Sequence, residues 1–252
     1  MVVDSIDCVC ALCGTKTHVE WCCGQDGFGI FPYITFDLLN EERLDFRAHG
    51  DVFFGRFFNS LHQCTHCGYV APNLSLTRFG IDKVVFSPEY IAKYKQDDTY
   101  GEYDPEKEIS LQEAYVFILE KIIKLSPETE ELKIQLLCAY LDAAWFYDDL
   151  LANYAENAQN ISRSIMYRIK AATCFENVTY FSVLGADFTP YDLLMVDVYR
   201  RLSMWEKAED LVNKILPNIV NDGIKETLLK QQELIKAMDC LCHDNNYYEP
   251  IP

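Results

Sequence analysis

Two copies of the pattern Cys-x-x-Cys-Gly constrain the fold of this chain more than any other sequence feature. They read Cys-Ala-Leu-Cys-Gly at residues 10–14 and Cys-Thr-His-Cys-Gly at residues 64–68. Two intervening residues let both sulfurs of a tight turn face one ion, and the glycine can take the positive φ that turns backbone N–H groups toward the thiolates. Four soft thiolates suit tetrahedral Zn²⁺. The sequence therefore predicts one closed, structural zinc ion per chain, with Cys10, Cys13, Cys64 and Cys67 as its ligands.

The long separation of the two motifs leaves alternatives open. Residues 14–63 lie between them, well beyond the about 15–20 residues of a compact four-cysteine pattern. We interpret the extra residues as an insertion at the tip of a zinc ribbon. Other cysteines and histidines could replace a ligand or bind a second metal, and they are Cys8, Cys22, Cys23, His18, His62 and His66 near the motifs and Cys240, Cys242 and His243 near the C-terminus.

The cysteine count indicates a compartment and a second class of function. Eleven is an odd number, and the first residues carry neither a basic nor an apolar run, so we expect no secretory signal and a cytoplasmic protein with reduced or metal-bound thiols. No segment approaches the about 18 apolar residues of a membrane span. A Cys-x-x-Cys pair can also be redox-active, and zinc with an open position can be catalytic. A zinc-dependent or thiol-redox enzyme is therefore the alternative to a non-enzymatic protein.

The charge of the chain bears on its partners. Lys and Arg number 22 against 39 Asp and Glu, which gives a net charge of −17. Such a surface repels nucleic acid and anionic membranes, because binding to phosphates depends on cationic side chains. The charge instead favours a protein partner with a basic patch and salt-sensitive binding. A regulator that imitates nucleic acid in a basic cleft is a further alternative.

Composition changes along the chain indicate two domains. Residues 18–21 and 51–58 are short β-type runs, and residues 97–108 are an acidic stretch with a Gly and a Pro that is typical of a linker. We predict a zinc-ribbon domain with an inserted segment over residues 1–96 and a helical domain over residues 109–252.

Six amphipathic helices are predicted after the linker, each with an apolar stripe toward the core. Their start signals are Ser110, Ser126–Pro127, Asn160, Thr189–Pro190 and Ser203, and the sixth helix carries Ile224 to Leu241. The stripe of the third helix is formed by Ile161, Ile165, Ile169, Ala172 and Phe175. Six helices joined by short turns stack as antiparallel pairs. The fold class is therefore a mainly α protein with a small β zinc ribbon.

The segment around residues 199–208 has the pattern of a tetratricopeptide (TPR) repeat centre. Tyr199, Leu202, Trp205 and Ala208 match it, with a small Ala where two helices cross closely. No second copy lies at a strict 34-residue period, so we predict a degenerate TPR-like helical array. A generic helical bundle is the alternative.

The chain resembles a bacterial family of uncharacterised proteins that carry two zinc knuckles around an insertion, followed by a TPR-like half. The resemblance lies in residues 44–47 (Leu-Asp-Phe-Arg), 64–73, 143–149 and 199–202 (Tyr-Arg-Arg-Leu). It implies the same fold and metal site, and it carries no assigned chemistry.

A few further residues could carry function. We interpret Asp148 and Asp149 as a solvated helix face, because adjacent helical residues point about 100° apart. Asp45 and Arg47 could clamp the insertion, and Arg47 and Arg56 could offset the charge of the zinc site. The four aromatic residues Phe53, Phe54, Phe57 and Phe58 form either core or a docking patch. Together these features predict a non-enzymatic adaptor that binds a protein partner.

Overall fold

A computed structural model describes residues 2–23, 61–94, 105–125, 130–153, 158–178, 190–220 and 222–240. Several predictions lie outside these ranges: the run 51–58, the insertion with Asp45, Arg47 and Arg56, the linker residues 97–104, and the pair Cys242 and His243. The side chains of Asp148 and Asp149 are not described either. None of the described helices has the length and hydropathy to cross a membrane.

The backbone divides into two compact units. The described part of unit 1 comprises residues 2–23, 61–94, 105–125 and 130–146, and that of unit 2 begins at residue 147. The division falls inside one helix. The domain boundaries 1–96 and 109–252 stay a prediction.

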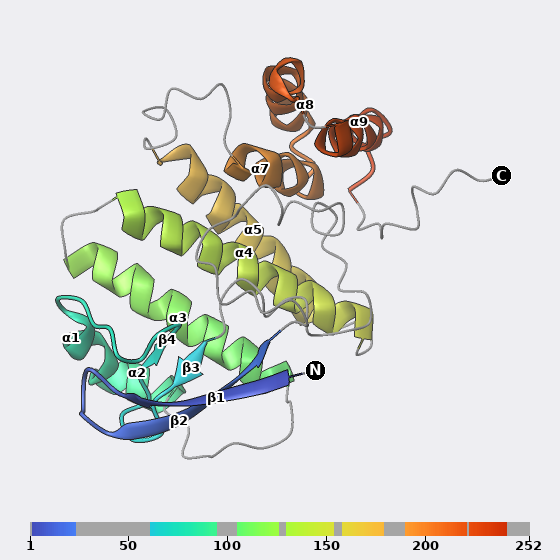
Figure 1. The fold of residues 1–252 in the computed structure, drawn as a ribbon. Coiled ribbons are helices and arrows are strands. Elements are labelled where there is room, and N and C mark those ends of the chain that lie inside the picture. The colour runs from blue at the N-terminus through green and yellow to red at the C-terminus, as the bar shows by residue number, and fades with distance from the viewer. Residues whose placement is uncertain are drawn as a thin grey trace. The chain divides into compact units, whose positions relative to one another are not determined.

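Unit 1 contains two small antiparallel sheets of two strands each (Figure 1). Strand β1 (Val2–Val9) pairs with β2 (Lys16–Cys23), and β3 (His62–Gln63) pairs with β4 (Val70–Ala71). The predicted β run at residues 18–21 is confirmed, since it lies within β2, but sequence reasoning missed β1, β3 and β4. In both sheets the connection between the strands contains a Cys-x-x-Cys-Gly motif.

The described helices of unit 1 are α1 (Ile81–Val85), α2 (Pro88–Tyr94), α3 (Pro105–Leu125) and α4 (Glu130–Asn153), and the last residues of α4 belong to unit 2. Helix α2 begins where the hydroxyl of Ser87 accepts a hydrogen bond from the Tyr90 N–H, at 3.2 Å. Tyr90 is fully buried, and its ring lies 5.9 Å from that of Phe117 on α3. The module around the second motif therefore has an apolar core, to which α3 and two helices that the sequence did not predict, α1 and α2, contribute.

The described part of unit 2 consists of the end of α4, α5 (Ala158–Glu176), α7 (Pro190–Arg201), α8 (Trp205–Ile215), the 3-10 turn η4 (Leu216–Asn218) and α9 (Asp222–Lys236). Helix α7 begins at Pro190, as predicted. Its residues 192–200 are all buried, among α5, α8 and α9. The described part of the chain is thus mostly helical with two small sheets, which confirms the predicted fold class at this level.

Three predicted helix starts are wrong. Helix α3 begins at Pro105, so Ser110 and the last predicted linker residues are helical. Asn160 lies inside α5. The residue before α8 is Met204, which makes no side-chain capping bond, and Ser203 has a φ of 56°. A Ser-x-x-Glu pattern is a local signal, and the backbone geometry of the turn overrides it here.

The predicted core stripe of α5 is also wrong in part. Ile161, Ile165 and Ile169 are 42%, 43% and 46% exposed. The neighbouring face is buried instead, with Ser164, Tyr167, Arg168 and Ala171, while Ala172 of the predicted stripe is buried as predicted. The two alanines permit close helix packing there, and the guanidinium of Arg168 donates a hydrogen bond to the hydroxyl of Ser164.

Candidate metal centre

Each Cys-x-x-Cys-Gly motif forms the turn of one hairpin, and the two turns have the same backbone hydrogen bonds. In the first, the Cys10 N–H donates to Thr15 O at 2.9 Å and the Gly14 N–H donates to Cys10 O at 2.8 Å. In the second, the Cys64 N–H donates to Tyr69 O at 2.8 Å and the Gly68 N–H donates to Cys64 O at 2.9 Å. Gly14 and Gly68 have φ values of 73° and 77°, a region that only glycine enters at little cost. The two glycines therefore allow the tight turns that direct the cysteine side chains of the two motifs toward one another.

The four thiols of the two motifs meet. The sulfur of Cys10 lies 3.6 Å from that of Cys67, and the sulfur of Cys13 lies 3.5 Å from that of Cys64. All four sulfurs lie within 4.8 Å of one another. The structure thus brings together the four cysteines that the sequence predicted, despite the long segment between them. The cluster is compatible with a bound metal ion.

Burial and hydrogen bonding shift the pKa values of the cluster thiols in different directions. Burial raises the pKa of Cys10 and of Cys67, although backbone N–H groups near each sulfur act in the opposite direction. Burial also acts to raise the pKa of Cys13, but the hydroxyl and N–H of Thr15 and the thiols of the second motif lower it to about 6. A cluster of buried thiols needs a positive ion to become fully ionised, since metal binding displaces the protons.

Neighbouring residues hold the two motifs in place. The Ala11 N–H donates to Leu74 O at 2.8 Å, which joins the first turn to the segment after the second. The Tyr90 hydroxyl of α2 donates to Gly68 O at 2.7 Å, and the Tyr69 hydroxyl donates to Leu76 O at 2.9 Å. The thiols therefore lie at fixed positions in unit 1.

Hydroxyl groups also contact the sulfurs, and sequence reasoning missed them. The Thr17 hydroxyl donates to the sulfur of Cys64 at 3.8 Å, across the two motifs. The hydroxyl of Thr15, the residue that follows the first motif, lowers the pKa of Cys13. Their positions two and four residues after Cys13 were the only available signal, and such a signal is weak without the geometry.

The other candidate ligands do not join the cluster. His18 is exposed and lies 3.0 Å from the carboxylate of Asp7, and the thiol of Cys8 contacts Thr17 O at 3.5 Å. Burial lowers the pKa of His62 to about 4, so this ring is neutral at pH 7. His66 is exposed.

No second cluster of three or more ligand groups occurs among the side chains that the structure describes. Cys240 is a free, half-buried thiol. The side chains of Cys22 and Cys23 are not described.

The chain matches no protein-family model, no curated protein and no solved structure. The resemblance to a family with two zinc knuckles therefore stays a prediction.

Proposed function

We propose that Cys10, Cys13, Cys64 and Cys67 hold one Zn²⁺ ion and that this ion is structural. The observation that carries the proposal is the placement of all four sulfurs within 4.8 Å of one another. Four thiolates fill the tetrahedral shell that Zn²⁺ prefers and leave no position for a substrate or a reactive water. The ion would join the β1–β2 hairpin to the β3–β4 hairpin, which is distant in sequence, and so stabilise this part of unit 1.

Metal analysis of the purified full-length chain tests this proposal. We expect about one zinc per chain, and loading with Co²⁺ should produce the absorption of a tetrahedral thiolate site. Cys64→Ser should abolish stoichiometric binding. Cys240→Ser is the matched control, because that thiol lies outside the cluster, and it should bind zinc like the wild type. Unchanged stoichiometry in Cys64→Ser would contradict the proposed ligand set.

We further propose that the chain is an adaptor that binds a protein partner, with α5 as part of the binding surface. Ile161, Ile165 and Ile169 follow one another at helical spacing along its exposed face, and Met166 beside them is 37% exposed. Contiguous exposed apolar side chains are typical of interaction sites. The net charge of −17 favours a partner that carries a basic patch.

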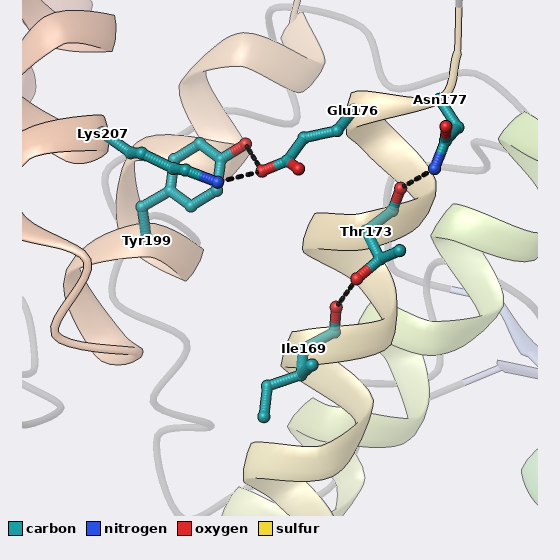
Figure 2. Close-up of polar contacts among 6 residues, drawn as sticks. All are labelled: Ile169, Thr173, Glu176, Asn177, Tyr199 and Lys207. Carbon is teal, nitrogen blue, oxygen red and sulfur yellow. Dashed lines mark hydrogen bonds and ion pairs between the residues drawn. The ribbon is translucent and has the colours of Figure 1, made fainter.

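The C-terminal end of α5 makes polar contacts with α7 and α8 in unit 2 (Figure 2). Glu176 Oε1 accepts hydrogen bonds from the Tyr199 hydroxyl of α7 at 3.2 Å and from Lys207 Nζ of α8 at 2.6 Å. Along the helix, the Thr173 hydroxyl donates to Ile169 O at 2.9 Å.

Affinity capture with matched variants tests the adaptor role. We expect Ile165→Asn to lose a protein that the wild type retains at low salt and releases at high salt. Leu229→Asn is the control, because Leu229 is also exposed but lies on α9, and it should retain that protein. Equal recovery with Ile165→Asn would remove α5 from the proposal, and recovery of no specific protein by the wild type would contradict the adaptor role itself.

We also infer a TPR-like arrangement of α7 and α8. Ala208 is fully buried, Tyr199 is 5% exposed, and the Met204 N–H donates to Tyr199 O at 2.8 Å in the turn between the helices. These features support the close crossing that the repeat pattern requires. Replacement of Ala208 by Leu should destabilise unit 2, since overpacking typically costs about 1–3 kcal/mol, whereas unchanged urea unfolding would contradict a close crossing.

A further inference from the structure

We propose that the Thr17 hydroxyl is a positioning group for the metal centre, which donates a hydrogen bond to the bound thiolate of Cys64. This inference rests on the proposed zinc site and deepens it. The juxtaposition that carries it is a buried hydroxyl 3.8 Å from a ligand sulfur that belongs to the other motif.

Burial makes this contact obligatory for the threonine. Thr17 is 2% exposed, so water cannot satisfy its hydroxyl, and buried hydroxyls in proteins almost always have a partner. The sulfur of Cys64 is the hydrogen-bond acceptor that the structure records for it within the described residues. The Thr17 hydroxyl therefore donates its hydrogen bond to the sulfur of Cys64, which is negatively charged when it binds a metal.

The position of Thr17 on β2 explains how it reaches the second motif. Thr17 pairs with Cys8 of β1 immediately after the turn of the first motif. The backbone of the hairpin holds Thr17 in place. The backbone carbonyl of Thr17 also accepts a hydrogen bond from the Cys8 thiol, at 3.5 Å. One side chain of the first hairpin thus contacts a ligand of the second, so the hydroxyl links the two halves of the site as well as stabilising its charge.

The negative charge of the metal site explains why a hydrogen-bond donor to a thiolate is stabilising. Zn²⁺ with four thiolates has a net charge of −2, and a donor to a thiolate stabilises the ionised ligand without adding a cation. Groups that orient ligands in this way typically change metal affinity by about 10- to 100-fold when they are removed.

The test compares three variants of the full-length chain in competition titrations with Zn²⁺ and in the absorption spectrum of the Co²⁺-loaded protein. Thr17→Val removes the hydroxyl at nearly constant volume and should lower zinc affinity about 10- to 100-fold. It should also move the sulfur-to-cobalt charge-transfer band to longer wavelength, because a thiolate without a donor gives up its electron more easily. Thr17→Ser keeps the hydroxyl and should restore both. Thr65→Val is the matched control, since Thr65 is exposed and adjacent to Cys64, and it should change neither.

The outcomes separate this inference from the zinc proposal. Wild-type affinity and an unmoved band in Thr17→Val would overturn the role of the hydroxyl while leaving the zinc site intact. Equal losses in Thr17→Val and Thr17→Ser with an unmoved band would also overturn it, because packing would then explain the loss. If Thr17→Val does not fold, Thr17→Ala is the second hydroxyl-free variant. Failure of the wild-type chain to bind either ion would instead overturn the zinc proposal, and this inference with it.

Discussion

Replacing Arg200 by Met should destabilise unit 2 by about 3–5 kcal/mol, because it leaves a buried carboxylate without its cation. Arg200 of α7 is fully buried. Its Nη2 donates to Asp197 Oδ1 at 2.7 Å, its Nε donates to Gln231 Oε1 of α9 at 2.7 Å, and its Nη1 donates to Asp239 O at 3.0 Å. One guanidinium therefore connects α7 with α9 and with the segment that follows α9.

The magnitude follows from burial. Asp197 and Gln231 are 0% and 1% exposed, so neither gains water when the guanidinium is lost. Two unit charges about 4 Å apart interact by about 4 kcal/mol at an effective dielectric constant of about 20, which agrees with the range measured when one partner of a buried pair is removed. The exposed pair of Arg78 and Glu131 is nearly as short at 2.8 Å, but its side chains are 40% and 71% exposed. Solvent screening limits such a pair to about 0–1 kcal/mol.

Urea unfolding and hydrogen exchange of α7 and α9 measure this difference. Arg200→Met should increase exchange in both helices, whereas the control Arg78→Met should change the free energy of unfolding by less than about 1 kcal/mol. The double variant Arg200→Met/Asp197→Leu should regain much of the loss, because it removes the isolated buried charge. A single variant as stable as the control, or a double variant no more stable than the single, would refute this reasoning.

Three further outcomes are expected. Removal of the metal with a strong chelator should increase hydrogen exchange in the two hairpins of unit 1 and leave α7 to α9 unchanged; exchange that rises equally everywhere would contradict a local structural ion. In urea unfolding, Ile165→Asn should change stability by no more than about 0.5 kcal/mol, because Ile165 is 43% exposed, whereas Leu137→Ala at a fully buried position should cost about 2–5 kcal/mol; equal losses would show that the α5 stripe is core. Glu176→Gln should change the free energy of unfolding by less than about 1 kcal/mol, since the side chains of Lys207 and Glu176 are 52% and 44% exposed, and a larger loss in thermal or urea unfolding would contradict this.

The metal ligands could be predicted from sequence because their signal is local. Two residues between cysteines and a following glycine specify a turn, and the structure has that turn twice, with φ values of 73° and 77° at Gly14 and Gly68. The contact of Thr17 with Cys64 could not be predicted in the same way. It joins residues of two different hairpins, and sequence spacing does not report which side chains of separate hairpins meet.

The helices show the same distinction. Pro190 marks the start of α7 correctly, since proline fits the first helical turn. Helices α1 and α2 are too short to show a recognisable helical period of apolar residues in the sequence. They form because Val85 and Tyr90 are buried in unit 1. Their packing gives the second motif an apolar support that composition did not predict.

The amino-acid sequence alone determined that this chain is mainly helical and that four particular cysteines are suited to one ion, because helix periodicity and turn chemistry act over a few residues. The tertiary structure decided that the four thiols meet, that a threonine hydroxyl contacts one of them, and that α5 buries Arg168 while it exposes three isoleucines. These outcomes depend on which surfaces pack together. Packing is a property of the whole unit, so no local pattern contains it.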